Sequence, residues 1–222
     1  MKLFCTNGVK AVAVELIPQS RLTVDADYRS TAALLETITS GGRGDLAVLS
    51  AEAIDDLIAQ GIVVRGSRID ICRSMIGVAI HRGVVAPDIS TADALRTVLL
   101  SANKVAYSRT GISGMYMPTL FEKLGIAAAI APKAVIPTSG SVGEAVARGD
   151  AEIGLQQISE LLPVAHIKVI GPLPDEVQRV TVFSAGVFVD ATEPRAARML
   201  VEQFTDNAAR PLYAAKGLEP AF

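Results

Sequence analysis

The sequence contains no tryptophan, and only 5% of its 222 residues are aromatic. Proteins that stack the bases of single-stranded nucleic acid need several aromatic side chains, so this kind of binding surface is excluded. The formal net charge is -2, whereas phosphate binding normally requires a basic surface. We therefore expect no nucleic-acid partner.

Histidine and cysteine are almost as scarce, with two residues of each type. His81 and His166 lie far apart in the sequence, and no cluster of carboxylates accompanies either one. Cys5 and Cys72 both lie in apolar, strand-like runs, and the sequence has no C-x-x-C motif. We therefore expect two buried, reduced thiols, no metal site and no cofactor.

No apolar run approaches the roughly 18 consecutive residues that cross a bilayer. An apolar segment ahead of a small-residue cleavage site is also missing, because Met1 and Lys2 lead directly into the first predicted strand. We therefore expect a cytoplasmic protein as the chain is given, or a periplasmic one if the chain is a trimmed mature form.

What the sequence has is a regular alternation of apolar, strand-like runs with amphipathic, helix-like runs. This alternation predicts an α/β fold with mostly parallel sheets. The expected strands are residues 3–6, 21–24, 45–51, 74–83, 104–108, 134–138, 151–157 and 180–190. The expected helices include residues 9–17, 53–60, 91–100, 115–126, 141–150, 158–162, 193–207 and 211–215, and one that opens in the polar stretch DYRSTAA and runs through Ile38.

Two long predicted strands, near residues 74–82 and 180–189, bracket the central part of the chain. If both strands cross between lobes, residues 1–79 and 184–222 form lobe 1 and residues 80–183 form lobe 2. A two-strand hinge of this kind permits closure around a ligand.

Four loops rich in Ser, Thr, Gly and Asn follow predicted strands and precede predicted helices. In parallel α/β sheets, ligands bind beyond the carboxyl ends of the strands, at the starts of the following helices. A helix start offers unpaired N–H groups and a partial positive charge, so it can bind an anion without a metal. The four loops are Thr6–Gly8, Arg29–Thr31, Arg109–Gly114 and Ser139–Val142.

Each loop also has a simpler explanation, which is that its polar side chains only cap the following helix. Thr6 and Asn7 can cap the first helix, and Ser141 with Glu144 matches the S-x-x-E capping box. Ser90 and Asp93 are similarly placed at the start of the helix expected over residues 91–100. Four such loops, two in each expected lobe, favour a shared ligand cleft over capping alone.

The order of these motifs resembles that of the molybdate-binding branch of the type II periplasmic binding proteins. The matching segments are Thr6-Asn7, Ser30-Thr31, SGGRGDLAVLSAE, RTGISGMYM, GSVGEA and the ending NAARPLYAAKGLEP, so the resemblance spans essentially the whole chain. It implies two lobes, each with a mostly parallel sheet flanked by helices, and an anion-binding cleft between them. It also implies that Ser113 contacts the ligand and that Val142 offers its amide.

Two departures from the family pattern bear on the ligand. The second-lobe tyrosine that donates to the oxyanion in the family is replaced around Gln156 and Gln157. Arg29 and Arg109 occupy loops in which oxyanion binders of this branch use neutral donors, and an arginine suits a carboxylate, which it binds through two parallel hydrogen bonds. Alternatively, both arginines point into solvent. The predicted ligand-binding residues are Thr6, Asn7, Arg29, Ser30, Thr31, Arg109, Ser113, Gly114, Ser141, Val142 and Gln157.

Three functions remain open at this level. The first is a solute-binding protein of an ABC-type transporter, which binds a molybdate- or tungstate-like oxyanion or an organic carboxylate and has a membrane permease as its partner. The second is a cytoplasmic isomerase, because relatives of this fold branch include isomerases that act on aconitate, an unsaturated tricarboxylate. That reaction requires a base, and no base is evident, so no catalytic residue is predicted. The third is a ligand sensor built on the same cleft.

Overall fold

The computed structural model describes residues 1–138 and 140–222, which divide into two compact units. Unit 1 contains Met1–Ser74 and Thr181–Phe222, and unit 2 contains Met75–Val180. The chain leaves unit 1 after Ser74 and re-enters it at Thr181, slightly before the boundaries expected from the sequence at residues 79 and 183. Within the described ranges, every helix is too short or too polar to cross a membrane.

Unit 1 is built on a six-stranded mixed sheet with the order β11-β4-β10-β3-β1-β2. Its strands are β1 (Lys2–Thr6), β2 (Asp25–Arg29), β3 (Leu46–Ser50), β4 (Ile69–Ser74), β10 (Thr181–Val187) and β11 (Leu218–Pro220). Its α-helices are α1 (Asn7–Leu16), α2 (Thr31–Thr39), α3 (Ala51–Ala59), α9 (Pro194–Phe204) and α10 (Arg210–Ala215). The pairs β1–β2 and β1–β3 are parallel, whereas β10 and β11 run antiparallel to their partners.

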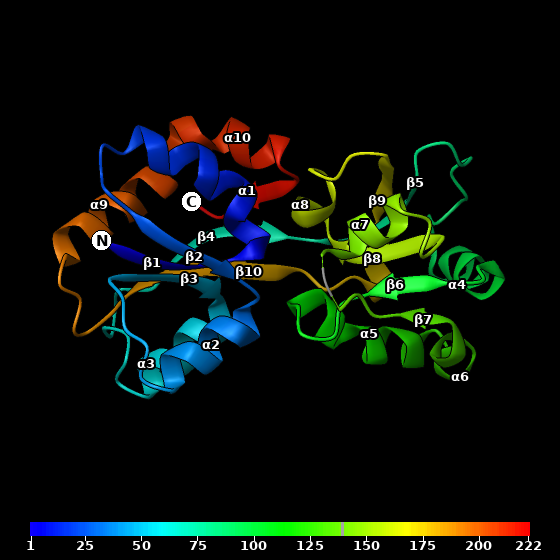
Figure 1. The fold of residues 1–222 in the computed structure, drawn as a ribbon, viewed down its shortest axis with the longest axis horizontal. Coiled ribbons are helices and arrows are strands. Elements are labelled where there is room, and N and C mark those ends of the chain that lie inside the picture. The colour runs from blue at the N-terminus through cyan, green and yellow to red at the C-terminus, as the bar shows by residue number, and fades with distance from the viewer. Residues whose placement is uncertain (139) are drawn as a thin grey trace. The chain divides into compact units, whose positions relative to one another are not determined.

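Helices α2 and α3 cover one face of the unit 1 sheet, and α1, α9 and α10 cover the other (Figure 1). The sequence requires helices on both faces, because the residues Leu46–Leu49 of β3 are all apolar and the strand is buried on both sides. Under α2 and α3, the ring of Phe4 packs 5.8 Å from that of Phe188, within a core to which Leu34, Ile38 and Leu57 also contribute.

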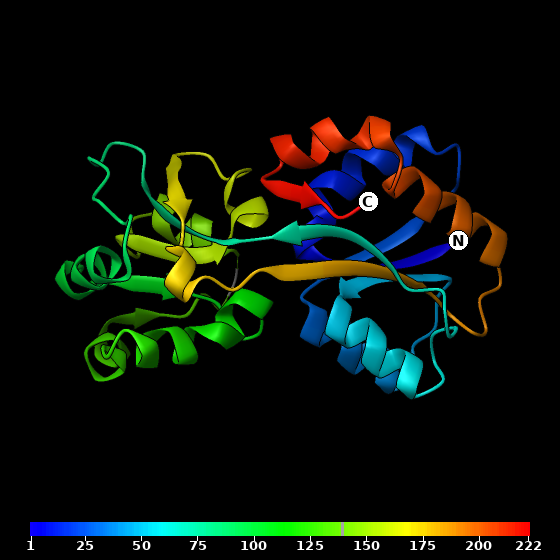
Figure 2. The same ribbon diagram turned by 180° about the vertical axis from the view of Figure 1, so that it is seen from behind.

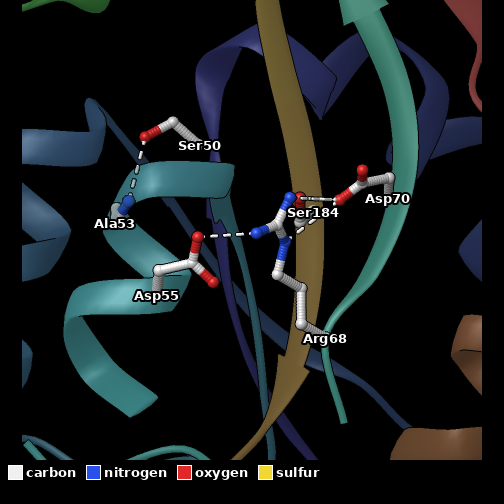
Figure 3. A network of polar contacts seen from close by, with 6 residues as sticks. All are labelled: Ser50, Ala53, Asp55, Arg68, Asp70 and Ser184. Atoms are coloured by element: carbon white, nitrogen blue, oxygen red, sulfur yellow. Dashed lines mark hydrogen bonds and ion pairs between the residues drawn. The ribbon is translucent and has the colours of Figure 1, made fainter. Parts of the chain in front are cut away.

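Strands β4 and β10 lie side by side and carry the chain out of unit 1 and back into it (Figure 2). Their register shifts at a bulge between Phe183 and Ser184, where the backbone ladder is interrupted. At that point the buried Ser184 hydroxyl donates to Asp70 Oδ1 over 2.7 Å. Figure 3 shows the Arg68 guanidinium between Asp70 and Asp55, and it donates to both carboxylates. Side-chain hydrogen bonds therefore stabilise the bulge, and through Asp55 they link it to α3.

Unit 2 is built on a five-stranded mixed sheet with the order β7-β6-β8-β5-β9. Its strands are β5 (Ile76–His81), β6 (Val105–Tyr107), β7 (Ala134–Val135), β8 (Ile153–Gln157) and β9 (Ile167–Pro172). Its α-helices are α4 (Ala92–Ser101), α5 (Ile112–Lys123), α6 (Ala127–Ile130), α7 (Val142–Ala147) and α8 (Ile158–Leu161). The pairs β6–β7 and β6–β8 are parallel, and β5 runs antiparallel to β8 and β9.

The two faces of the unit 2 sheet carry separate cores. Helices α4, α5 and α6 pack a large core on one face, to which Leu155 of β8 contributes. Helices α7 and α8 pack a smaller core on the other face, where Val146 and Leu161 meet Ala79 (Figure 1). Gly154 of β8 faces this second side, because a Cβ there would lie 2.8 Å from Val146 Cγ2. Since side chains alternate along a strand, Gln156 also faces α7 and α8.

The structure corrects three sequence-based expectations. The strand expected at residues 21–24 is wrong, because the strand is Asp25–Arg29, whose last three residues were assigned to a helix start. The strand expected at residues 74–83 is β5 alone, and β4 before it was missed. The cap of α4 is Thr91, whose Oγ1 accepts from the Ala94 N–H over 3.1 Å, and not Ser90.

Candidate functional site

The carboxyl edge of the unit 1 sheet carries three helix starts next to one another. The adjacent parallel strands β2, β1 and β3 each run into a helix with no loop between, so that α1 begins directly after Thr6 and α3 directly after Ser50. Only Ser30 separates β2 from α2. Because parallel strands end at the same edge, the predicted residues Thr6, Asn7, Ser30 and Thr31 are brought together.

Two of these helix starts are capped by their own serine. The Ser30 hydroxyl accepts from the Ala33 N–H, and the Ser50 hydroxyl accepts from the Ala53 N–H, each over 3.3 Å. Ser30 therefore caps α2, as the simpler explanation of this loop predicted. Ligand binding by Ser30 stays a prediction.

The start of α1 is different, because Thr6 does not cap it. The Thr31 hydroxyl donates to the Thr6 hydroxyl over 3.0 Å, and both side chains are buried. The first turn of α1 also contains no acidic residue. The start of α1 thus has neither a cap from its N-cap residue nor an acid in its first turn.

Gly8, the second residue of α1, has a packing role. A Cβ at this position would lie 2.4 Å from Cζ of Phe183, so only glycine lets α1 approach β10 closely. Asn7 before it is half-buried at the first helical position.

The two arginines that were predicted to bind a carboxylate have different surroundings. Arg29 donates through Nε and Nη2 to both carboxylate oxygens of Asp27, two residues away on the same strand. Arg109 is exposed in the segment before α5, and it makes no ion pair with the described residues. Binding of a carboxylate ligand remains a prediction for both arginines. For Arg29, it requires the guanidinium to release Asp27 and bind the ligand instead.

In unit 2, the predicted loop before α5 forms a tight connection. The N-cap of α5 is Gly111, which has no side chain to cap the helix, and the first turn contains no acidic residue. Ser108 Oγ accepts from the Gly111 N–H over 3.2 Å. A Cβ on Gly114 would lie 1.9 Å from the carbonyl oxygen of Ser108, so this glycine lets α5 sit directly on the end of β6. Ser113 is buried beside it.

The capping box predicted at α7 is present. Ser141 Oγ accepts from the Glu144 N–H over 3.2 Å, and Glu144 Oε2 accepts from the Ser141 N–H over 2.7 Å. The Ser141 side chain is therefore used as a cap, and Val142 is buried at the first helical position. Ser139, which was part of the predicted loop, lies outside the described residues.

A pair of polar side chains that sequence reasoning did not assign as ligand residues lies at the end of β8. Gln156 Nε2 donates to Glu160 Oε2 over 2.8 Å, while Gln157 next to it is buried. Burial raises the pKa of the Glu160 carboxyl to about 7, although the hydrogen bond from Gln156 opposes the shift. The sequence shows only a glutamate in a short helix, so its desolvation could not be predicted.

The described residues contain no group of three or more His, Cys, Asp and Glu side chains that could hold a metal ion. Cys5 and Cys72 are buried free thiols, and burial raises the pKa of both above its ordinary value. The described residues at the two sheet edges therefore offer backbone N–H groups, hydroxyls, side-chain amides, guanidinium groups and carboxyl groups.

The chain passes twice between two α/β units, and in each unit helix starts lie at one edge of the sheet, an arrangement typical of two-lobed solute-binding proteins. The model of the family described as bacterial extracellular solute-binding protein matches residues 2–219. The chain belongs to this family.

Solved structures of the same class share the fold. The periplasmic molybdate-binding protein of Azotobacter vinelandii is matched with a TM-score of 0.78 and 18% identity over 98% of each chain. The sulfate-binding protein SubI of Mycobacterium tuberculosis H37Rv is matched with a TM-score of 0.76 and 15% identity over 100% of this chain and 86% of that one. These similarities confirm the predicted fold class.

A more similar sequence comes from an enzyme. Aconitate isomerase of a Pseudomonas species is 36% identical over 177 residues, which cover 79% of this chain and 67% of the enzyme.

Proposed function

We propose that this protein binds a small anion through the helix starts at the two sheet edges. The observation that carries the proposal is that α1 and α5 both begin without a capping side chain from their N-cap residue and without an acid in the first turn. By contrast, α3, α4 and α7 each have a capping hydroxyl and an acidic residue in the first turn. An anion is the partner that complements an uncompensated helix start.

Membership of a solute-binding family supports this proposal, and so do the names of the structures that share the fold. Those names specify molybdate and sulfate for the relatives in question. For this chain we propose the wider class, a tetrahedral oxyanion such as molybdate or tungstate, or an organic carboxylate. We further propose that a membrane permease of the ABC type receives the anion from an exported form of the protein.

The ligand class is tested by thermal unfolding in the presence of molybdate, tungstate, sulfate, citrate, cis-aconitate and trans-aconitate. A ligand that binds only the folded state stabilises it by RT ln(1 + [L]/Kd), about 2.7 kcal/mol at a hundredfold excess over Kd. We expect a saturable rise in Tm with at least one of these anions, and none with the neutral triamide of citrate. If no anion raises Tm at millimolar concentration, the proposal is wrong.

The expectation that both units contribute to one ligand stays a prediction. It is tested by measuring the affinity of one anion for variants altered at Asn7 in unit 1 and at Ser113 in unit 2. Losses of affinity in both variants support a shared ligand, whereas a loss in only one of them contradicts it.

A second function is favoured by the 36% identity to aconitate isomerase. In this alternative, the protein binds an unsaturated tricarboxylate and moves its double bond. Incubation of the protein with cis-aconitate, followed by ultraviolet absorbance and proton NMR, tests for turnover. Formation of the trans isomer at a rate proportional to protein concentration supports the alternative, and an unchanged spectrum rejects it.

A further inference from the structure

The Gln156–Glu160 pair in unit 2 is a buried polar site that helix capping does not explain. Gln156 is 5% exposed, and its Nε2 donates to Glu160 Oε2 over 2.8 Å. Its Oε1 is also buried, yet it has no hydrogen-bond partner among the described residues. A buried acceptor without a donor is destabilising. The pair is therefore an incompletely satisfied polar site inside unit 2.

The pair also lies at the edge where a ligand is expected. Gln156 is next to the last residue of β8, and Glu160 is in the first turn of α8. Side chains in the first turn of a helix lean toward its N-terminal end, which here is the carboxyl edge of the sheet. The neighbouring parallel strand β6 leads to the start of α5 at the same edge.

The Glu160 side chain is partly exposed, yet its carboxyl group is desolvated by burial. It is half-buried, and burial raises its pKa to about 7. The titratable side chains on the elements that pack against α8 are Glu144 of α7, His81 of β5 and Lys168 of β9. None of them contributes to the shift, which comes from burial and is opposed by Gln156 alone. A carboxylate with these properties can take up and return a proton near neutral pH.

We propose that Glu160 is the carboxylate that transfers the proton when this protein shifts the double bond of an unsaturated tricarboxylate, with Gln156 as its positioning residue. The inference rests on the second function proposed above, and it supplies the base that the sequence did not reveal.

The reaction requires only the substrate and the carboxyl group of Glu160. A carboxylate oxygen of Glu160 takes a proton from the methylene carbon next to a substrate carboxylate, and the C–H electron pair delocalises over the double bond and that carboxylate. The protonated Glu160 then returns the proton to the far carbon of the former double bond. One C–H bond breaks and one forms, the double bond moves by one position, and no oxidant or reductant is needed. Helix-start amides can stabilise the charge that develops.

The decisive variant is Glu160→Gln, which keeps the size of the side chain and removes the base. We expect turnover of cis-aconitate to fall by about 10²–10⁴-fold, the usual contribution of a general base. The shift in Tm that tricarboxylates produce should remain. Glu152→Gln is the matched control, because Glu152 precedes the opposite end of β8, where it is exposed and pairs with Asn103. Its turnover should equal that of the wild type.

A second variant and a pH profile separate catalysis from a structural role. Glu160→Asp keeps the carboxylate but withdraws it by one methylene, so we expect turnover to fall by at least about tenfold. The kcat/KM of the wild type should rise with pH and level off above about 7, because this parameter follows the free protein, in which the base form accumulates above the Glu160 pKa. The residual activity of Glu160→Gln should lack this rise.

The outcomes identify which claim fails. If the wild type binds tricarboxylates but does not isomerise them, the isomerase function fails and anion binding stands. If the wild type is active and the Glu160→Gln or Glu160→Asp variant retains its full rate, the assignment of Glu160 is overturned and the isomerase function stands. Loss of turnover with retained binding and a lost pH dependence supports the assignment.

Discussion

The Thr31 hydroxyl donates a hydrogen bond to the Thr6 hydroxyl over 3.0 Å in the interior of unit 1. This bond joins the starts of α1 and α2, two helices that begin 24 residues apart in the sequence, at Asn7 and Thr31. The Thr6 hydroxyl does not cap α1, and the first turn of α1 has no acid, so this helix start is suited to an anionic partner. In our account, that partner is the bound anion.

Removing either hydroxyl of this pair should destabilise unit 1. Thr6→Val or Thr31→Val leaves the remaining hydroxyl buried without its partner, so we expect the free energy of unfolding to fall by about 1–3 kcal/mol. The double variant should lose less than the sum of the single losses, because it leaves no orphan hydroxyl. Urea unfolding measures these differences. Thr97→Val on the exposed face of α4 is the control, and strictly additive losses would show that the two hydroxyls are not coupled.

The close approach at the start of α5 should make Gly114 intolerant of a side chain. In Gly114→Ala the new Cβ would lie 1.9 Å from a backbone oxygen, so the first turn of α5 must move. We expect a loss of about 1–3 kcal/mol of stability, typical of overpacking, and weaker anion binding. Gly111→Ala is the matched control, because its Cβ would meet only the rotatable Ser108 hydroxyl, at 2.6 Å. Equal effects of the two variants, measured by urea unfolding and ligand titration, would contradict this reading.

Asp45 should make unit 1 sensitive to acid. Burial acts to raise its pKa, but hydrogen bonds from the N–H groups of Glu193 and Lys2 and from the Thr192 hydroxyl outweigh it, so the pKa lies below the ordinary value of 3.8. A lowered pKa means that the ionised form stabilises the fold. This contribution is complete above the unfolded pKa, near pH 4, and is lost as the pH falls through the lower folded value.

Asp45→Asn should therefore destabilise the protein at neutral pH and reduce the further loss of stability below about pH 4. The measurement is urea unfolding across this pH range. Asp56→Asn, at an exposed position on α3, provides the control. A variant with the acid sensitivity of the wild type would show that Asp45 is not its source.

The two predicted arginines should contribute unequally to carboxylate binding. Arg109 has no ion-pair partner among the described residues, whereas Arg29 is held by Asp27. We expect Arg109→Ala to weaken the binding of citrate or aconitate by about tenfold or more, the value of a charge-assisted hydrogen bond, and Arg29→Ala to have a smaller effect. Calorimetric titration measures both, with Arg148→Ala as the control because Arg148 pairs with Asp150 at the surface. If neither variant changes the affinity, the proposed grip on a carboxylate is wrong.

The parts of the fold that the sequence predicted are those determined by local patterns. Strand β3 was found because Leu46–Leu49 form a continuous apolar run, and the capping box at Ser141 and Glu144 follows from spacing alone. The edge strands β2, β9 and β11 were misplaced or missed. An edge strand is half-exposed and tolerates polar residues, so it lacks the continuous apolar run that marks a central strand.

The site was predictable to the extent that strand ends and helix starts are visible in the sequence. Thr6 and Thr31 were both chosen as ligand residues, but their mutual hydrogen bond depends on the pairing of β1 with β2. Glu160 could not be found from the sequence, because its raised pKa comes from burial within the folded unit 2. Tertiary contacts decide both features.

The most direct test of the account is calorimetric titration of the wild-type protein with molybdate, sulfate, citrate and cis-aconitate at one pH and ionic strength. The account predicts saturable binding of at least one of these anions, weakened when the first turn of α5 is displaced by Gly114→Ala. An absence of binding for every anion, or an affinity that is unchanged in that variant, would contradict the central claim that uncapped helix starts hold a negatively charged ligand.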